Sequence, residues 1–512
     1  MELITFVVLL TIAIALPLYS RRKRYRLPPG PKGLPIVGNA FDVLADYEWL
    51  TYAKWSREYD SDIIYLNIAG TPIYVLNSVQ ATTDLLEKRS SIYSDREIMT
   101  MCHEIVGWGQ NFALMPYGDS WREHRRMFHQ HFHPGVVDKH HAHIEKQAKD
   151  LLRRIHANPD GLMKYLRIMA GAAILRVVYG IDVQPENDHY IGVAEAAIHS
   201  LALTGNAGSY LVDNFPILRY LPSWAPGAQF KRDGERWRAQ VNQMFTEPLD
   251  LVKQRMANGE PSDCVAATLL ASIDERKDKP RAELETVVKH VSGTAYVGGA
   301  DTTVSSIATF VLAMLKFPQV QRIAQAELDN VIGIGRLPSI SERPSLPYIT
   351  AVMKESLRWN LVLPSSVPRK MTTDDEYRGY FIPAGSLIIA NAWAVLHDET
   401  RYPNPDVFDP TRFLTSEGKL DKTAPDPVEA CFGFGRRICP GRHFAMDTIW
   451  LNIAYILTTF NIEKPLDPSG QPVEPSGKYT SGFLSHPVPF KVNFTPRSKA
   501  AEALIREAVF YD

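Results

Sequence analysis

The sequence has little excess charge of either sign and few cysteines. Lysine and arginine number 56 against 57 acidic residues, a formal net charge of -1, so the charge balance gives no indication of nucleic-acid binding. Four cysteines in 512 residues, none in a C-x-x-C pair, are too few for a disulfide framework and indicate reduced, cytosol-facing thiols. Repeats and low-complexity tracts are also absent, and the 45% hydrophobic content is that of an ordinary globular chain.

Two common cofactor-binding patterns are missing as well. No glycine-rich dinucleotide fingerprint, G-x-G-x-x-G, follows a predicted strand, so electrons for redox chemistry would have to come from another protein. His129 and His133 have the i, i+4 spacing of zinc ligands. However, Pro134-Gly135 breaks the helix there, and no cysteine or carboxylate is spaced to complete a site. We therefore expect a solvated surface at these histidines.

The longest hydrophobic run lies at the N-terminus. Residues 3–18 are almost all apolar, which is close to the length that spans a bilayer as a helix. A basic cluster follows at residues 21–26, and positive charge stays on the cytosolic side. A cleaved signal peptide would need a basic region before the run and a small-residue cleavage site, and neither is present. We expect residues 1–20 to be a transmembrane anchor, in the endoplasmic reticulum of a eukaryote.

The remaining chain divides into a hinge and one domain. Residues 21–36 contain the basic cluster and the segment Leu27-Pro28-Pro29-Gly30-Pro31. Because proline fixes φ, we expect this segment to be a stiff hinge. Residues 37–512 form the expected cytosolic catalytic domain. Alternation around Gly70-Thr71-Pro72 predicts a hairpin. Helical patterns are expected at 145–246, 283–317, 348–359 and 445–460, and strands at 380–394.

Two adjacent glycines stand in the middle of the longest predicted helix, in Gly298-Gly299-Ala300-Asp301-Thr302. Each glycine costs on the order of 1 kcal/mol relative to alanine in a helix interior. Such a cost indicates space for a ligand or a kink between packed partners.

A second pair of side chains, Trp121 and Arg125, is four residues apart and shares one face of a predicted helix. An indole N–H beside a guanidinium suits a carboxylate. Alone, the pair is also compatible with a surface cation–π contact.

A buried cluster of charges is the third candidate. Glu355 and Arg358 are three residues apart in a helical stretch, so their side chains can pair. Arg412 lies in a P-x-R-F segment further along the chain. If the three charges are buried together, loss of one member would cost roughly 3–5 kcal/mol. We interpret this cluster as structural.

The segment on which the other motifs depend runs from Phe432 to Gly441, F-G-F-G-R-R-I-C-P-G. It places Cys439 in a glycine-rich loop just before an apolar helical pattern. A buried thiolate needs a partner that accepts its charge, and iron is such a partner. Gly435 and Gly441 would permit the turn and the close approach of a flat ring. Arg437 could meet an acidic group on that ring.

Taken together, these motifs resemble the cytochrome P-450 family. The cysteine loop matches every fixed position of the family's haem-ligand loop, F-x-x-G-x-R-x-C-x-G. The W-x-x-x-R, G-G-x-D-T and E-x-x-R motifs precede it in the family's order. The resemblance covers nearly the whole chain and implies the family's fold. That fold is mainly α with small β-sheets, a single catalytic domain behind an N-terminal membrane anchor.

The resemblance also implies a cofactor and its binding residues. The cofactor would be haem b, with Cys439 as the metal ligand and arginines on its propionates. Gly298 and Gly299 would form the oxygen groove, with Asp301 and Thr302 as the catalytic proton-delivering pair. The implied haem-binding residues are Trp121, Arg125, Arg369, Phe432, Gly435, Arg437, Cys439 and Gly441.

The implied reaction is the oxidation of a small molecule with O2. Electrons would come from NADPH through a membrane-bound reductase. The amino-acid pattern of residues 26–35 and 377–380 resembles that of fungal family members from specialised metabolism. The substrates of such members include terpenoids and aromatic or indole compounds. Two alternatives stay open. One is a haem-thiolate isomerase or dehydratase that uses no external electrons, and the other is a non-enzymatic haem-binding sensor.

Overall fold

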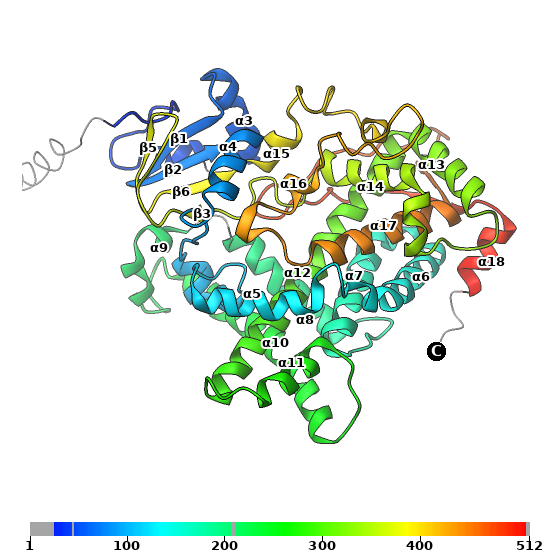
Figure 1. Ribbon diagram of the computed structural model, residues 1–512, viewed down its shortest axis with the longest axis horizontal. Coiled ribbons are helices and arrows are strands. Elements are labelled where there is room, and N and C mark those ends of the chain that lie inside the picture. Colours follow the sequence, from blue (N-terminus) through cyan, green and yellow to red (C-terminus); the bar gives the residue numbers. More distant parts are fainter. Residues whose placement is uncertain (1–24, 44–45, 206–209, 508–512) are drawn as a thin grey trace, which may run out of the picture.

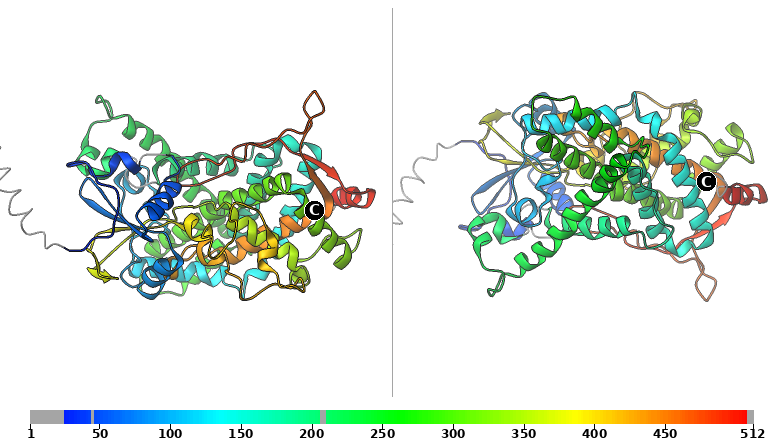
Figure 2. Two further views of the ribbon diagram at one scale, coloured as in Figure 1. Left: turned by 90° about the horizontal axis from the view of Figure 1, so that it is seen from above. Right: turned by 90° about the horizontal axis from the view of Figure 1, so that it is seen from below.

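We describe a computed structural model of the chain, covering residues 25–43, 46–205 and 210–507. The predicted anchor, residues 1–20, and the first part of the hinge lie outside the described residues. Figure 1 shows a sheet-containing region at one end of the molecule and helices filling the rest. The two views in Figure 2 show the same arrangement from above and below. The predicted class, mainly α with small β-sheets, is confirmed.

The largest sheet has four strands, in the order β1-β2-β6-β3. β1 (Ile63–Ile68) and β2 (Thr71–Leu76) form the predicted antiparallel hairpin, turning at Ala69 and Gly70 with φ of 47° and 92°. β6 (Leu387–Ala390) pairs in parallel with β2, and β3 (Arg369–Lys370) pairs with β6. The smaller sheets pair β4 (Asp375–Tyr377) with β5 (Tyr380–Ile382) and β7 (Phe460–Glu463) with β8 (Asn493–Pro496).

The helical region is organised around α12 (Arg281–Lys316), a helix of 36 residues that stops before Pro318 as predicted. Its middle turns are almost wholly buried, and it packs closely against α7. The region predicted as helical between 145 and 246 resolves into several helices. The other long helices are α3 (Glu48–Glu58), α5 (Asp119–Phe132), α6 (His141–Ala157), α7 (Leu162–Tyr179), α8 (His189–Thr204), α10 (Gln229–Ala257), α11 (Val265–Asp274), α13 (Pro318–Val331), α14 (Pro347–Trp359), α17 (Arg442–Thr459) and α18 (Lys499–Glu507).

Within the described part of the chain, α12 is the one helix long and apolar enough to cross a membrane. Of its most apolar window, 78% is buried inside the protein. A helix covered on most sides by its own fold is a core helix. α12 therefore gives no support to a membrane span.

The three charged side chains predicted to cluster lie together between α14 and the segment that precedes the cysteine loop. Arg358 donates to both carboxylate oxygens of Glu355, at 2.7 and 2.9 Å. Arg412 Nε donates to Glu355 Oε1 at 3.1 Å. Arg358 also donates to the Leu396 and Pro405 carbonyls at 3.0 and 2.7 Å. Burial raises the pKa of Glu355, while Arg358 and Arg412 act in the opposite direction. The cluster fixes the chain between α14 and the cysteine loop.

Candidate active site

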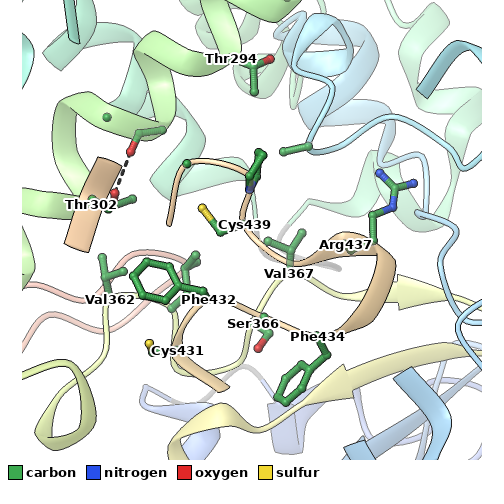
Figure 3. Close-up of a pocket in the computed structure, with 18 of the residues that line it drawn as sticks. Thr294, Thr302, Val362, Ser366, Val367, Cys431, Phe432, Phe434, Arg437 and Cys439 are labelled. Carbon is green, nitrogen blue, oxygen red and sulfur yellow. Dashed lines mark hydrogen bonds between the residues drawn. The ribbon is translucent and has the colours of Figure 1, made fainter. Parts of the chain in front are cut away.

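One cavity lies between the middle of α12 and the cysteine loop. Figure 3 shows Cys439 pointing into it, with Thr302 of α12 on one side and Arg437 on the other. The residues that line it are mostly apolar, and none of those described is Asp or Glu. Its polar lining comes from hydroxyl groups and arginines. The hydroxyls belong to Thr294, Thr302, Thr303, Ser306 and Ser366.

The cysteine loop is held in place by its backbone. The Cys439 N–H donates to the carbonyl of Phe432 at 2.8 Å, which closes the loop. Gly435 has φ of +50°, and a Cβ there would lie 2.1 Å from the Leu86 carbonyl oxygen, so no other residue fits. Gly441 is different, because its φ is −89° and a Cβ would approach only the Phe128 ring, at 3.8 Å. The turn therefore requires glycine at 435 but not at 441.

The surroundings of the Cys439 sulfur partly stabilise a negative charge. Burial raises the pKa of the Cys439 thiol, while the backbone N–H of Gly441 and the guanidinium groups of Arg125 and Arg442 act in the opposite direction. Donors aimed at a sulfur favour its thiolate form. Without a cation the thiol remains protonated, and a metal ion at the sulfur would deprotonate it outright. The site thus has the chemistry of a metal-thiolate ligand.

Four arginine side chains line the same cavity, and none forms an ion pair with a carboxylate of the described residues. Burial and neighbouring guanidinium groups lower the pKa of Arg437 to about 9, and burial lowers that of Arg125 and Arg369 to about 10. Burial lowers the pKa of Arg96 too, with further lowering from Arg437 and Arg369. Four desolvated like charges repel one another. The cavity rim is therefore suited to a ligand with more than one negative charge.

Arg437 gives the most direct evidence that the cavity suits such a ligand. Its Nε donates to the Ser94 carbonyl at 2.7 Å and its Nη2 to the Met115 carbonyl at 2.8 Å. Its guanidinium lies over the Trp121 ring, 4.4 Å from the centroid. Its Nη1 is buried and has no hydrogen-bond partner. An unpartnered buried donor on a charged group is costly, and an acidic group in the cavity would supply the acceptor.

Arg96 was not found from the sequence. It belongs to no motif and lies in a loop, where its guanidinium donates to the carbonyls of Ala113, Val367 and Pro368. Arg369 on β3, which was predicted, donates to the Phe434 carbonyl at 2.5 Å. The structure thus places all four predicted propionate-binding side chains on this cavity and adds Arg96.

The two adjacent glycines of α12 have different effects on the structure. A Cβ at Gly298 would meet no protein atom within 4 Å, so this glycine leaves open space on the cavity side. A Cβ at Gly299 would lie 2.8 Å from Ile174 Cγ1 on α7, so this glycine lets the two helices approach. Both line the cavity. The Thr302 hydroxyl also lines it and donates to the Gly298 carbonyl at 2.7 Å.

Asp301 does not line this cavity. It lies on a second one, enclosed by α7, α8, α12 and the loop near residue 480. There His486 Nε2 lies 3.0 Å from Asp301 Oδ2, and Arg167 Nε lies 3.7 Å from Oδ1. Burial raises the pKa of Asp301, but His486 and Arg167 outweigh it and the net shift is downward. The predicted catalytic pair therefore faces two separate spaces.

The C-terminal segment 480–484 contributes to the second cavity and not to the cavity of Cys439. Thr480, Ser481 and Leu484 line that second cavity. The histidines at 129 and 133 stack on each other, 5.1 Å between ring centroids. Within the described residues, no group of three metal-ligating side chains is present.

The fold and the site define a haem-thiolate protein, and the sequence places it in a family. The chain matches the cytochrome P-450 family over residues 28–494, and it belongs to that family. It is therefore a monooxygenase by class.

Three relatives with similar sequences are fungal proteins. The chain is 44% identical to cytochrome P-450 monooxygenase 98 of Postia placenta, over 98% of this chain and 96% of the relative. It is 43% identical to tryptamine 4-monooxygenase of Psilocybe cyanescens, over 94% of each chain. Cytochrome P-450 monooxygenase ple1 of Rhodocybe pseudopiperita is 41% identical, over 95% of this chain and 92% of the relative.

The family implies haem, and the cavity fits it. Haem b is flat, carries two carboxylates and needs one axial ligand. The cavity offers the Cys439 sulfur, which faces the Gly441 amide and the Arg125 guanidinium. It also offers a rim of arginines without carboxylate partners, one of them with an unpartnered Nη1, and open space at Gly298 of α12. Each of these features would be costly or unexplained in a protein that bound no such group.

The two adjacent glycines give a matched test of the site geometry. We expect Gly299→Ala to lower the melting temperature by several degrees, because overpacking against Ile174 costs about 1–3 kcal/mol. Gly298→Ala should leave the melting temperature equal or higher, because alanine favours the helix, while altering the haem absorption spectrum. Thermal unfolding and visible absorption of both holoproteins measure this, and equal melting temperatures would contradict the assignment.

Proposed function

We propose that this monooxygenase oxidises a small, largely apolar natural product in fungal secondary metabolism. It would use O2 and electrons from an NADPH-dependent reductase. The observation that carries the proposal is the juxtaposition in one cavity of Cys439, unpaired arginines and the Gly298–Thr302 turn of α12. The names of the fungal relatives support a small-molecule substrate.

The residues that would hold the cofactor can be assigned individually. Cys439 would ligate the iron, with the Gly441 amide and Arg125 facing its sulfur. Trp121, Arg125, Arg369 and Arg437 would hold the propionates, together with Arg96. Bound in this way, haem supplies the chemistry of O2 activation and insertion of one oxygen atom into a C–H bond. The protein orients the substrate, excludes bulk water and delivers protons from Thr302 and Asp301.

The cavity lining favours an uncharged substrate. None of the described lining residues is acidic, and several buried arginines lie on one side. A protonated amine entering this space would be desolvated without a carboxylate partner, at a cost of several kcal/mol. Terpenoids and neutral aromatic or indole compounds avoid this cost. The hydroxyls of Thr294, Ser306 and Ser366 could orient a single polar group.

Surface arginines and the N-terminal sequence support proposals for the redox partner and for the location. We propose an NADPH-cytochrome reductase as the electron donor, with Arg436 and Arg442 at its acidic docking face. Arg436 is exposed and follows the turn at Gly435, on the same loop as Cys439.

We propose the endoplasmic reticulum membrane as the location, with the catalytic domain on the cytosolic side. The apolar run at residues 3–18 and the basic cluster after it support this.

The proposed function is tested by oxidation under labelled O2. The full-length protein is expressed with a fungal reductase, and microsomes receive NADPH, 18O2 and parallel panels of neutral terpenoids, neutral indoles and protonated tryptamines. We expect a product that carries one 18O atom from a neutral compound, with little turnover of the amines.

The alternative functions give different results in the same assay. A rearranged or dehydrated product without 18O and without NADPH use would indicate an isomerase or dehydratase. Haem binding without any product would indicate a sensor. Exclusive turnover of protonated amines would contradict the argument from the cavity lining.

Thr302 provides a test of proton delivery. We expect Thr302→Ala to consume NADPH at a rate within a few-fold of the wild type while releasing most of the reduced oxygen as peroxide. The reason is that the hydroxyl on the cavity wall is lost. Thr302→Ser keeps the hydroxyl and is the matched control, expected to retain most of the coupling. Product per NADPH and peroxide are measured together, and normal coupling in Thr302→Ala would remove Thr302 from this role.

A further inference from the structure

The second cavity has no part in the function described so far, yet it holds the acid of the proton-delivering pair. Asp301 and Thr302 are adjacent on α12, so their side chains point about 100° apart around the helix. Thr302 faces the haem-binding cavity and Asp301 faces the second cavity. A proton that reaches the first cavity through Asp301 must therefore start from the second.

His486 is the group that holds Asp301 in that position. Its Nε2 lies 3.0 Å from Asp301 Oδ2, and both side chains are about 15% exposed. This is the shorter of the two ion-pair contacts of Asp301, since Arg167 Nε lies 3.7 Å from the other carboxylate oxygen. The His486 Nδ1 is buried and has no hydrogen-bond partner among the residues that the structure describes. Among these residues, the ion pair of the imidazole is with Asp301.

Hydrogen bonds hold the loop that carries His486 against α12. The His486 N–H donates to Thr480 Oγ1 at 3.0 Å, and the Thr480 N–H donates to the His486 carbonyl at 2.8 Å. The Ser305 hydroxyl of α12 donates to the Ser485 carbonyl at 2.7 Å. His486 is therefore held rigidly against the helix turn that bears Asp301, as a residue that sets geometry must be.

Other charged groups also face this space. Arg167 comes from α7, and Glu195 and His199 come from α8. The cavity is thus lined by side chains that can exchange protons with water, whereas the lining of the haem-binding cavity contains no described acid or histidine. This contrast distinguishes the second cavity as the side from which protons are supplied.

We infer that protons enter through the second cavity and that His486 is the positioning residue that holds Asp301 there to collect them. This rests on the proposed monooxygenase function. Each turnover combines one O2 with two electrons and two protons, leaving one oxygen atom in the product and one in water. A proton passes from water in the second cavity to the Asp301 carboxylate beside His486 Nε2. The Asp301 side chain then turns toward Thr302 and the haem-binding cavity, and releases the proton there.

The decisive experiment compares His486→Gln and His486→Lys with wild type in the full-length holoenzyme with reductase. His486→Gln removes the ion-pair partner of Asp301, so we expect product per NADPH to fall several-fold. We also expect the solvent deuterium isotope effect on product formation to rise. His486→Lys keeps a cationic N–H donor and should restore most of the coupling. The spectral change on substrate binding should be the same in all three proteins.

The results separate this inference from the function on which it rests. A wild-type enzyme that makes no oxygenated product would refute the proposed function before His486 is considered. An active wild type with the same coupling and isotope effect as His486→Gln would overturn the inference. Lower activity with an unchanged isotope effect, not restored by lysine, would indicate a merely structural role and would overturn it as well.

A second measurement does not depend on turnover. In protein labelled with 13C-histidine, the resonance missing from His486→Gln identifies His486. Asp301→Asn removes the carboxylate partner 3.0 Å from Nε2, so we expect the chemical shift of this resonance to change. The same chemical shift in wild type and Asp301→Asn would show that the pair does not exist in solution.

Discussion

The charge of one sulfur atom, Cys439 Sγ, is the constraint to which the rest of the structure is adapted. The sulfur is enclosed, and burial alone keeps it a neutral thiol. The amides of the loop and the guanidinium of Arg125 oppose that effect only in part, so the thiolate requires a cation. The cavity is complementary to a group with a cationic centre and anionic edges. Its sulfur suits a metal, and its arginines suit carboxylates.

The surrounding fold keeps this electrostatic arrangement in place. Glu355 and Arg358 are buried and Arg412 is half-buried. Glu355 accepts hydrogen bonds from both arginines, and the arginines donate to backbone carbonyls of the segment before the cysteine loop. Gly435 allows that loop to approach the Leu86 carbonyl. On the opposite wall, Gly299 allows α7 to pack against α12 while Gly298 leaves the cavity open. α12 thereby divides two spaces, one for the cofactor and substrate and one that faces Asp301.

Much of the fold and of the site could be predicted from the sequence, because periodicity and local spacing carry that information. The hairpin at Gly70, the long helix before Pro318 and the pairing of Glu355 with Arg358 depend on neighbours a few residues apart. Arg96 could not be predicted, since a lone arginine in a loop has no local pattern. The need for glycine at position 299 comes from its close contact with Ile174, which lies more than a hundred residues away in the chain. The different orientations of Asp301 and Thr302 follow from helix geometry, but what each side chain faces is decided by tertiary packing.

The carbon-monoxide spectrum of the reduced holoprotein is the most direct test of Cys439 as the iron ligand. Cys431 lines the same cavity as Cys439, which makes it a matched control. We expect the absorption band of thiolate-ligated haem in the wild type and in Cys431→Ser, and its loss in Cys439→Ser. A thiolate band that survives in Cys439→Ser, or a wild-type spectrum typical of histidine ligation, would contradict this assignment.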